Sequence, residues 1–337
     1  MANRFWKGTG RWLPGLLISL IAIAAILYFV DLDALVEAVR LANYWLLLGG
    51  VAISLLWLPA RSLVWRTLLQ NKASFKHVFL TVCEGYLLNS IFPFRLGEIG
   101  RAFLLNRKSG IPFMEVLPTI VIERVLDLAM SAAVLLIAVP FVVGAAGAET
   151  VALIMGGLVV LGLAGLYFLA RYREGVMRWF EKVSQPRPRL QAAGNFLNSF
   201  FTGLGVLTNG WLFLRVLIYM IINWAVAILQ FFLFILAFFP EAQPIWAFFG
   251  LGAAAFGAAV PSLPGAVGTY EGAFGGALTL LSGDSATALA AALTAHLLGY
   301  LTNIIFGVIA FSTEGETVLG VYQQLRRRQD AGREEKE

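Results

Sequence analysis

The chain of 337 residues has a single cysteine, Cys83, and two histidines, His77 and His296. One cysteine cannot form an internal disulfide, and it offers no thiol pair for redox or metal chemistry. The two histidines lie far apart in the sequence, without the spacing of metal ligands. We therefore expect no metal site and no disulfide.

Charged residues are scarce as well. They make up 13% of the chain, whereas apolar residues make up 59%, and the mean hydropathy is +0.79. Soluble domains are about a quarter charged, and long apolar runs are typical of membrane spans, so this composition excludes a soluble globular protein. The net charge of +5 does not indicate nucleic-acid binding, because membrane proteins concentrate Lys and Arg in cytoplasmic loops.

Motifs of nucleotide binding and nucleophilic catalysis are also missing. No GxGxxG, GxxxxGK[ST] or GxSxG pattern occurs in the sequence. The longest polar segment is the loop after residue 170, which leaves no room for a soluble catalytic domain. We therefore expect no catalytic residues, no cofactor and no enzyme activity.

Apolar runs of about 20 residues, the length of a membrane span, are frequent. They cover residues 12–30, 43–60, 114–143, 150–170, 213–239 and 285–312. Two further regions, 77–108 and 244–281, are apolar but interrupted, and reading each as a re-entrant hairpin puts nearly all Lys and Arg on one side. The sequence thus predicts an all-α polytopic membrane protein. It would have about six full spans and two re-entrant broken-helix hairpins of opposite orientation, which suggests an inverted repeat.

This topology predicts one transmembrane domain over 1–312 and a polar tail over 313–337, with both termini in the cytoplasm. It places basic residues such as Arg61 and Lys108 in cytoplasmic segments. Segment 173–209 is expected to form two amphipathic helices on the inner surface, with a plain linker as the alternative. We expect a multi-pass protein of the cytoplasmic (inner) membrane of a bacterium or archaeon.

Helix breakers and charges meet in the first interrupted region, which contains the stretch IFPFRLGEIGR. Irregular backbone at membrane depth is tolerated only where it is buried in protein or lines a cavity. Arg95 and Arg101 carry guanidinium groups that match phosphate geometry, and the helix start near Gly97 offers free N–H groups. The pattern favours a cavity for an anionic headgroup. Glu98 either holds an arginine or binds a coupling ion, and pairing is the favoured interpretation.

A second group of charges lies in ERVLD, inside an otherwise apolar span. Helical spacing puts Glu123 and Asp127 on one face, and Arg124 can also meet Asp127. Charges buried in a membrane either line a pathway or pair with one another, and both readings stay open.

The second interrupted region, PSLPGAVGTYEGAFGG, carries Glu271, which could cap freed amides or reach across to the arginines. His296 is expected to be a hydrogen-bonded packing residue rather than a proton relay. The expected substrate-binding residues are Arg95, Glu98, Arg101, Glu123, Arg124, Asp127, Glu271, Asn89 and Tyr270.

Three stretches together resemble the lysylphosphatidylglycerol synthase transmembrane-region family, in the family's order. They are LLNSIFPFRLGEIGRAFLL, VIERVLDLAM and PSLPGAVGTYEGAF, and the resemblance covers about residues 12–312. It implies a flippase-like domain, such as the one that moves aminoacylated phosphatidylglycerol between leaflets in multiple peptide resistance factor proteins. The aminoacyl transferase domain of those proteins is not expected here, so the lysyl substrate is not carried over.

Two functions are compatible with these observations. The first is a lipid flippase or transporter for an anionic lipid, either a phospholipid or a polyprenyl-phosphate lipid. The alternative is a non-catalytic membrane partner or scaffold for a lipid-modifying enzyme, docked through residues 173–209. A homo-oligomer is compatible with either function.

Overall fold

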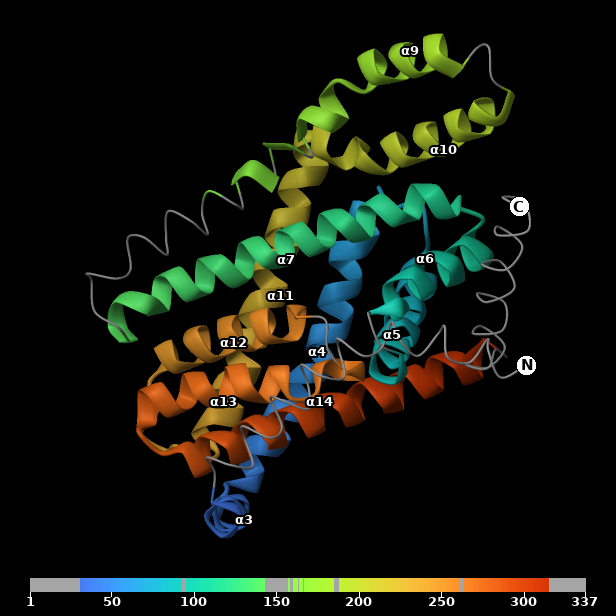
Figure 1. Ribbon diagram of the computed structural model, residues 1–337. Helices are drawn as coiled ribbons and strands as arrows, with labels where there is room; N and C mark the ends of the chain where they lie inside the picture. Colours follow the sequence, from blue (N-terminus) through green and yellow to red (C-terminus); the bar gives the residue numbers. More distant parts are fainter. Residues whose placement is uncertain are drawn as a thin grey trace, which may run out of the picture.

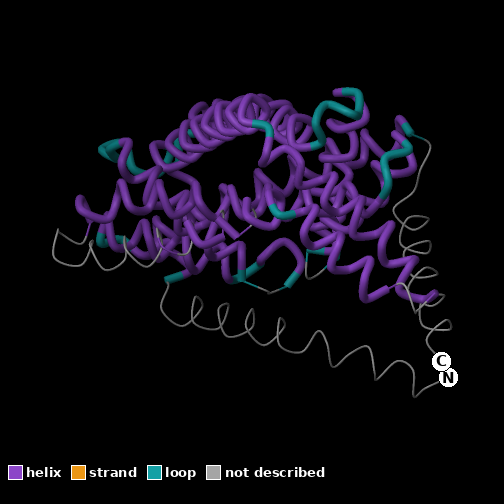
Figure 2. Tube along the Cα trace, turned by 90° about the horizontal axis from the view of Figure 1, so that it is seen from above, coloured by secondary structure: helices purple, strands orange, loops and turns teal. Residues whose placement is uncertain are grey.

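The structure is a computed structural model that describes residues 31–92, 95–142, 157, 160–162, 164–165, 167–184, 188–260 and 263–314. The expected span at 12–30, most of the one at 150–170 and the tail beyond 314 lie outside the described residues. Within the described ranges the chain is α-helical and contains no strand (Figure 2). This confirms the expected all-α fold.

Four long helices are apolar enough to cross a membrane. They are α4 (Tyr44–Leu68), α7 (Phe113–Val142), α11 (Gly210–Leu236) and α14 (Ser285–Thr313). At 1.5 Å per residue each is longer than the hydrocarbon core of about 30 Å. Large apolar side chains project outward from them, and Trp45, Phe141 and Trp211 are 82%, 74% and 67% exposed. Such an outer surface suits lipid, so the chain is an integral membrane protein.

Polar side chains fix where these helices begin. Asn43, Asn209 and Asp284 are the N-caps of α4, α11 and α14, and each accepts a hydrogen bond from a backbone N–H of the first turn. Asp31 caps the short helix α3 (Leu32–Leu41) in the same way. These caps satisfy amides that have no partner within the helix.

Both interrupted regions fold as pairs of short helices. The first hairpin consists of α5 (Phe75–Ile91) and α6 (Leu96–Ser109). The second consists of α12 (Pro244–Ala259), the 3-10 turn η2 (Pro264–Ala266) and α13 (Thr269–Ser282). All four α-helices are shorter than a span of about 20 residues, and the two helices of each hairpin pack together. The breaks predicted from the sequence are therefore confirmed, although Pro93 and Pro261 themselves lie outside the described residues.

Glycine makes both breaks sterically feasible. A Cβ on Gly97 would collide with the backbone oxygen of Gly85 and the side chain of Asn89, so only glycine lets α6 approach α5 this closely. Gly265 has φ of 70°, a left-handed conformation that glycine adopts without strain.

The described helices repeat one order: a long helix, a hairpin, and a second long helix. The units are α4–α7 and α11–α14, and α4 packs extensively against α11. Each hairpin also packs on a long helix of the other unit, since α5 contacts α14 and α12 contacts α7 (Figure 1). This order supports the repeat suggested by the sequence, and it brings both breaks to the middle of the molecule.

Between the units lie two further helices, α9 (Arg173–Ser184) and α10 (Pro188–Leu204), followed by the turn η1 (Gly205–Thr208). They pack on each other, and α10 packs against α7 (Figure 1). The two-helix prediction for 173–209 is confirmed, whereas the position of these helices at a membrane surface stays a prediction.

One boundary was wrong. The span expected over 43–60 continues to Leu68 as α4, so Arg61 lies inside the long helix and not in a loop after it. Its side chain is 3% exposed and sits among carboxylates. The physical reason is that ion pairing within the protein compensates the cost of burying its charge.

Candidate functional site

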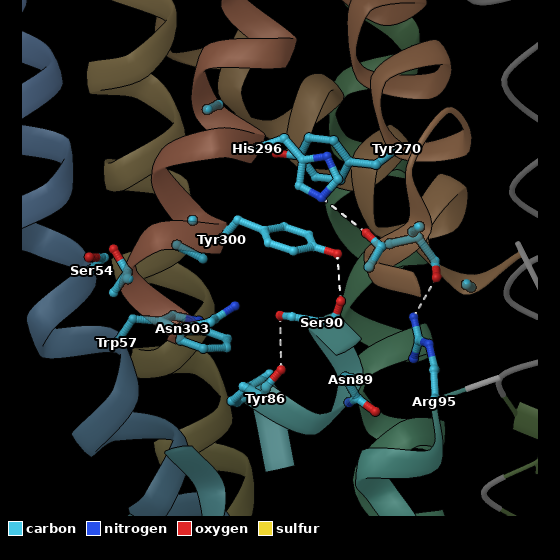
Figure 3. Close-up of a pocket in the computed structure, with 18 of the residues that line it drawn as sticks. Ser54, Trp57, Tyr86, Asn89, Ser90, Arg95, Tyr270, His296, Tyr300 and Asn303 are labelled. Atoms are coloured by element: carbon cyan, nitrogen blue, oxygen red, sulfur yellow. Dashed lines mark hydrogen bonds between the residues drawn. The ribbon is translucent and has the colours of Figure 1, made fainter. Parts of the chain in front are cut away.

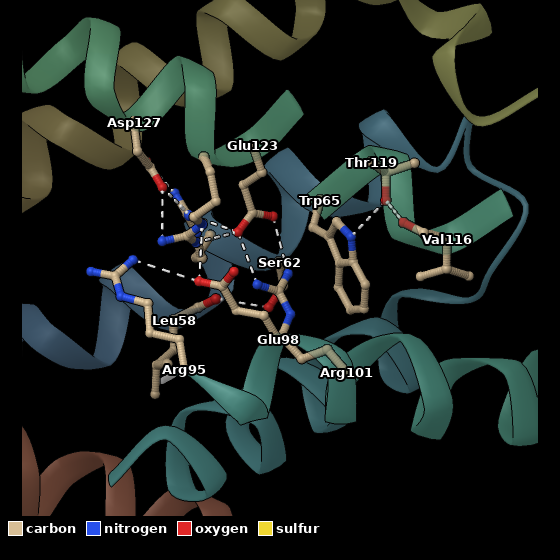
Figure 4. A network of polar contacts seen from close by, with 12 residues as sticks. Leu58, Ser62, Trp65, Arg95, Glu98, Arg101, Val116, Thr119, Glu123 and Asp127 are labelled. Atoms are coloured by element: carbon tan, nitrogen blue, oxygen red, sulfur yellow. Dashed lines mark hydrogen bonds and ion pairs between the residues drawn. The ribbon is translucent and has the colours of Figure 1, made fainter. Parts of the chain in front are cut away.

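Glu123 is the centre of a buried ion-pair cluster (Figure 4). Its carboxylate is 0% exposed and accepts hydrogen bonds from three guanidinium groups. Arg61 donates at 2.6 Å, Arg124 at 2.7 Å, and Arg101 donates two bonds at 2.9 and 3.0 Å. The two parallel bonds from Arg101 fix the orientation of the carboxylate.

The cluster extends along α7 to Asp127 and across to α6. Arg61 donates to both oxygens of Asp127, at 2.7 and 2.5 Å, and Arg124 lies 3.3 Å from the same carboxylate. Glu98 lies 3.4 Å from Arg124 and 3.6 Å from Arg95. Three helices, α4, α6 and α7, are thereby joined through charged side chains.

We call this group the arginine–carboxylate cluster. It contains Arg61, Arg95, Arg101, Arg124, Glu98, Glu123 and Asp127. Four arginines face three carboxylates, so the cluster carries one positive charge in excess. An anion is the ligand that would neutralise it.

Trp65 on α4 packs against the cluster. The guanidinium of Arg101 lies 4.0 Å from the centre of its ring, and the indole N–H donates to the Thr119 hydroxyl at 3.1 Å. Cation–π contacts of this kind stabilise a desolvated guanidinium.

Replacing Trp65 by phenylalanine is expected to destabilise the protein by about 1–2 kcal/mol, because one buried hydrogen bond is lost and the cation–π contact weakens. Chemical denaturation in micelles measures this change. Trp211→Phe is the matched control, since Trp211 is 67% exposed. An equal loss in both variants would contradict a supporting role for Trp65.

Two adjoining cavities open beside the cluster, with volumes of about 510 and 470 Å3. They share the lining residues Trp57, Tyr86, Arg95, Glu98, Arg124, Ala227, Leu251, Ala258 and Ala259. We call them together the polar cavity. Arg95 and Arg124 bring guanidinium groups to its wall, and their side chains are 40% and 27% exposed.

Arg95 connects the first hairpin to the second. Its guanidinium donates to the Ala258 carbonyl, near the end of α12, at 2.6 Å (Figure 3). Arg95 is also the N-cap of α6, and its backbone is left-handed, with φ of 52°. A non-glycine residue in this conformation costs about 1–3 kcal/mol and is common at functional sites. The strained backbone directs a cationic side chain into the cavity.

Tyr300 on α14 makes a second connection. Its hydroxyl lies 3.0 Å from the Ser90 carbonyl in the first hairpin (Figure 3). The same hydroxyl lies 3.0 Å from the Pro264 carbonyl in the second hairpin. A hydroxyl has one proton to donate, so the two carbonyls share it. Movement of one break relative to the other must disrupt this contact and the bond from Arg95.

Glu271 lies at the start of α13 and does not contact the arginines. One oxygen accepts the backbone N–H of Gly268 at 2.7 Å, which is the capping role considered from the sequence. The other oxygen lies 2.5 Å from Nδ1 of His296, and Nε2 of His296 lies 3.0 Å from the Gly265 carbonyl. The Tyr270 ring stacks on the imidazole, with 4.3 Å between ring centres.

A separate buried pair holds the first hairpin together. Lys108, expected in a cytoplasmic segment, donates to both oxygens of Glu84 at 2.7 and 2.6 Å. The two side chains are 4% and 0% exposed. This pair fixes α6 against α5 and does not line the polar cavity.

The structure thus separates the expected site residues into three places. Arg101 and Glu123 lie in the buried centre of the cluster. Arg95, Glu98, Arg124 and Asp127 line the polar cavity, together with Asn89 and Tyr270. Glu271 belongs to the second break. Sequence reasoning missed Arg61 as a member, and its position just after Pro59 in an apolar run was the available signal.

Comparison with known proteins finds two similar sequences. Glycosyltransferase AglD of Haloferax volcanii is 25% identical over 331 residues, covering 87% of this chain and 53% of that protein. A UPF0104 membrane protein of Methanocaldococcus jannaschii is 31% identical over 120 residues, covering 34% of this chain and 36% of that protein. The chain therefore spans about half the length, or less, of the curated relatives it matches.

No solved structure matches the chain. The profile of the Lysylphosphatidylglycerol synthase TM region matches residues 12–307, which include both hairpins, ERVLD and the long helices around them. That match covers most of the sequence and agrees with the resemblance found in the three motifs. The chain belongs to the Lysylphosphatidylglycerol synthase TM region family.

Proposed function

We propose that this protein is a lipid flippase or transporter. It binds the phosphate of an anionic lipid in the polar cavity and moves the lipid between leaflets. The single observation that supports this most is the excess positive charge of the arginine–carboxylate cluster, presented to the cavity by Arg95. In a hydrocarbon environment such a charge is costly unless a pathway or a ligand uses it.

The charged residues have two roles in this proposal: some hold the cluster together and others bind the lipid phosphate. Arg101 and Glu123 hold the cluster, because both are buried and bonded to each other. Arg95 and Arg124 contact the phosphate, since their guanidinium groups reach the cavity wall and offer paired donors. Glu98 and Asp127 orient these two arginines. Acyl or polyprenyl chains stay in the bilayer while the headgroup occupies the cavity.

The lipid is a phospholipid or a polyprenyl-phosphate lipid. The second choice draws support from the relative named a glycosyltransferase and from the cavity lining. Trp57 and Tyr86 offer aromatic faces, and Asn89 and Asn303 offer amides, which suit a sugar headgroup. The protein itself is proposed to transport and not to catalyse. Its place is the cytoplasmic membrane, with both termini inside.

A cavity-filling variant tests this proposal in vesicles. The purified protein is reconstituted, and the transfer of labelled phosphatidylglycerol, a polyprenyl-phosphate sugar and phosphatidylcholine between leaflets is followed. We expect transfer of at least one anionic lipid, and its loss in Ala258→Phe, because Ala258 lines both cavities. Leu280→Phe is the control, since Leu280 is 73% exposed and does not line the cavity.

The alternative is a scaffold for a lipid-modifying enzyme, docked through α9 and α10. It predicts no lipid transfer by the purified wild type. It also predicts that Ala258→Phe leaves capture of that enzyme unchanged. Transfer that is equal for phosphatidylcholine and for both anionic lipids would also count against the proposed headgroup site.

A further inference from the structure

His296 faces hydrogen-bond acceptors at both ring nitrogens. Nε2 lies 3.0 Å from the Gly265 carbonyl (Figure 3). Nδ1 lies 2.5 Å from an oxygen of Glu271. A backbone carbonyl can only accept, so Nε2 must carry a proton to bond it. The question is then which group holds a proton between Nδ1 and the carboxylate.

A proton count answers it. With one proton between Nδ1 and Glu271, both contacts are hydrogen bonds, whether the pair is written as imidazolium and carboxylate or as imidazole and carboxylic acid. Without that proton, a neutral imidazole has a single N–H. That N–H can donate to Glu271 or to Gly265 but not to both, and the lone pair of the other nitrogen then faces an acceptor. Both contacts can therefore be hydrogen bonds at the same time only if the pair holds one extra proton.

Loss of the proton would act on the second break. Glu271 also caps Gly268 at the start of α13, and Gly265 has its left-handed φ of 70° in η2. The contacts of His296 to Glu271 and Gly265 hold the two ends of this break, so losing either contact frees one end. Tyr300, which lies 3.0 Å from the Pro264 carbonyl, connects the same kink to the first hairpin.

Other ionisable groups face the imidazole from the helices around it. Tyr270 of α13 stacks on the ring, and Tyr300 of α14 meets it edge-on. Across the polar cavity lie Tyr86 of α5, Arg95 and Glu98 at the start of α6, and Arg124 of α7. The residues of α4, α11 and α12 that line the cavity of about 510 Å3 have no ionisable side chain. Glu271 is thus the carboxylate in direct contact with the ring.

We propose that His296 and Glu271 form a proton-binding site that couples proton transfer to movement of the second hairpin. The protonated pair holds the break in the observed conformation, and deprotonation releases it. Since the held state binds one more proton, acid favours it and base favours release, by about tenfold per pH unit once the pair titrates. The coupling to lipid movement rests on the proposed transport function, whereas the proton site does not.

Nuclear magnetic resonance of the imidazole tests the proton site directly. The chain has two histidines, so His77→Gln leaves His296 as the sole source of signal in histidine-labelled protein in lipid nanodiscs. We expect a pH range in which both ring nitrogens of His296 are hydrogen-bonded donors or share the proton with Glu271. A ring that is neutral at every pH, with one bare nitrogen, would overturn the proposal.

Glu271→Gln is the matched variant. Its amide oxygen can still accept the Gly268 N–H, and its amide nitrogen can donate to a bare Nδ1 of neutral His296. Nε2–H then bonds Gly265 with no extra proton. This variant should therefore keep the held conformation at all pH values, with a neutral imidazole. An unchanged titration of His296 in this variant would sink the proposed pair.

A reporter cysteine in the break measures release. Cys83 is buried, and Cys83→Ala with Leu263→Cys leaves one thiol beside η2. The rate at which a thiol reagent labels this cysteine is measured as a function of pH. Because a thiol itself becomes more reactive in base, each labelling rate is divided by the labelling rate of the same cysteine in the Glu271→Gln background. We expect this ratio to rise with pH in the otherwise native protein. A ratio independent of pH would contradict release.

These readouts keep the two proposals distinguishable. If the wild type moves no lipid, but the imidazole titrates and the break opens, the transport function fails and the proton site stands. If lipid moves while the imidazole stays neutral throughout, the proton site fails alone. If both readouts behave as expected, a pH gradient across the vesicle should change the rate of lipid transfer in the wild type but not in Glu271→Gln.

Discussion

Glu123→Gln is expected to destabilise the protein by about 3–5 kcal/mol, as the removal of one partner from a buried ion pair does. The carboxylate is 0% exposed and accepts four hydrogen bonds from three arginines. Glutamine has nearly the same shape but no charge, and its amide N–H groups would point at guanidinium donors. Arg101 would then be a buried cation without its carboxylate.

Chemical denaturation in mixed micelles measures this loss, and the variant should also melt at lower temperature. Glu37→Gln is the control of the same chemistry. Glu37 and Arg40 form a pair 4.0 Å apart, with side chains 60% and 75% exposed, so the expected change is at most about 0.5 kcal/mol. A stability of Glu123→Gln equal to that of wild type would mean that the cluster does not hold the fold together.

The hairpins could be predicted from the sequence because their cause is local. Proline and glycine occur together in the apolar runs at 93–97 and 261–268, and the combination disfavours a continuous helix there. Proline alone does not end a helix here, since Pro59 lies inside α4 and Pro118 inside α7. The long helices followed from hydropathy in the same way. Their packing, in which each hairpin lies on a long helix of the other unit, depends on contacts that no local pattern encodes.

The candidate site was only partly predictable, for a related reason. Glu123 and Asp127 could be recognised as candidates because they are charged residues in an apolar run. Arg61 lies 62 positions earlier, near the end of such a run, where counting basic residues assigns it to a loop. Its burial is visible only once α4 and α7 are placed together.

His296 shows the same limit. A lone histidine in an apolar helix has no partner in the sequence, and the packing role was a reasonable expectation. Its contacts to Glu271 and Gly265 come from residues 25 and 31 positions away. Only the fold of the second break shows that both nitrogens face acceptors.

Arg95→Gln should weaken binding of an anionic headgroup by about tenfold to a hundredfold. This range is that of a lost hydrogen bond to a charged group, about 1.5–3 kcal/mol. The substitution removes the excess positive charge of the cluster while leaving its buried centre intact. Because the Arg95 side chain is 40% exposed, the melting temperature should change little. Arg95→Lys keeps the charge without the planar fork, so an intermediate loss is expected.

Displacement of labelled lipid from the purified protein measures this effect for phosphatidylglycerol and, as a neutral lipid without a phosphate, for diacylglycerol. Arg40→Gln is the matched control, because its side chain is 75% exposed on α3 and does not line the cavity. Selective loss of the anionic lipid in Arg95→Gln would locate the phosphate at this arginine. An equal loss for both lipids would instead show that Arg95 only ties the first hairpin to Ala258. The cluster would then be structural, and the scaffold would become the better account of the protein.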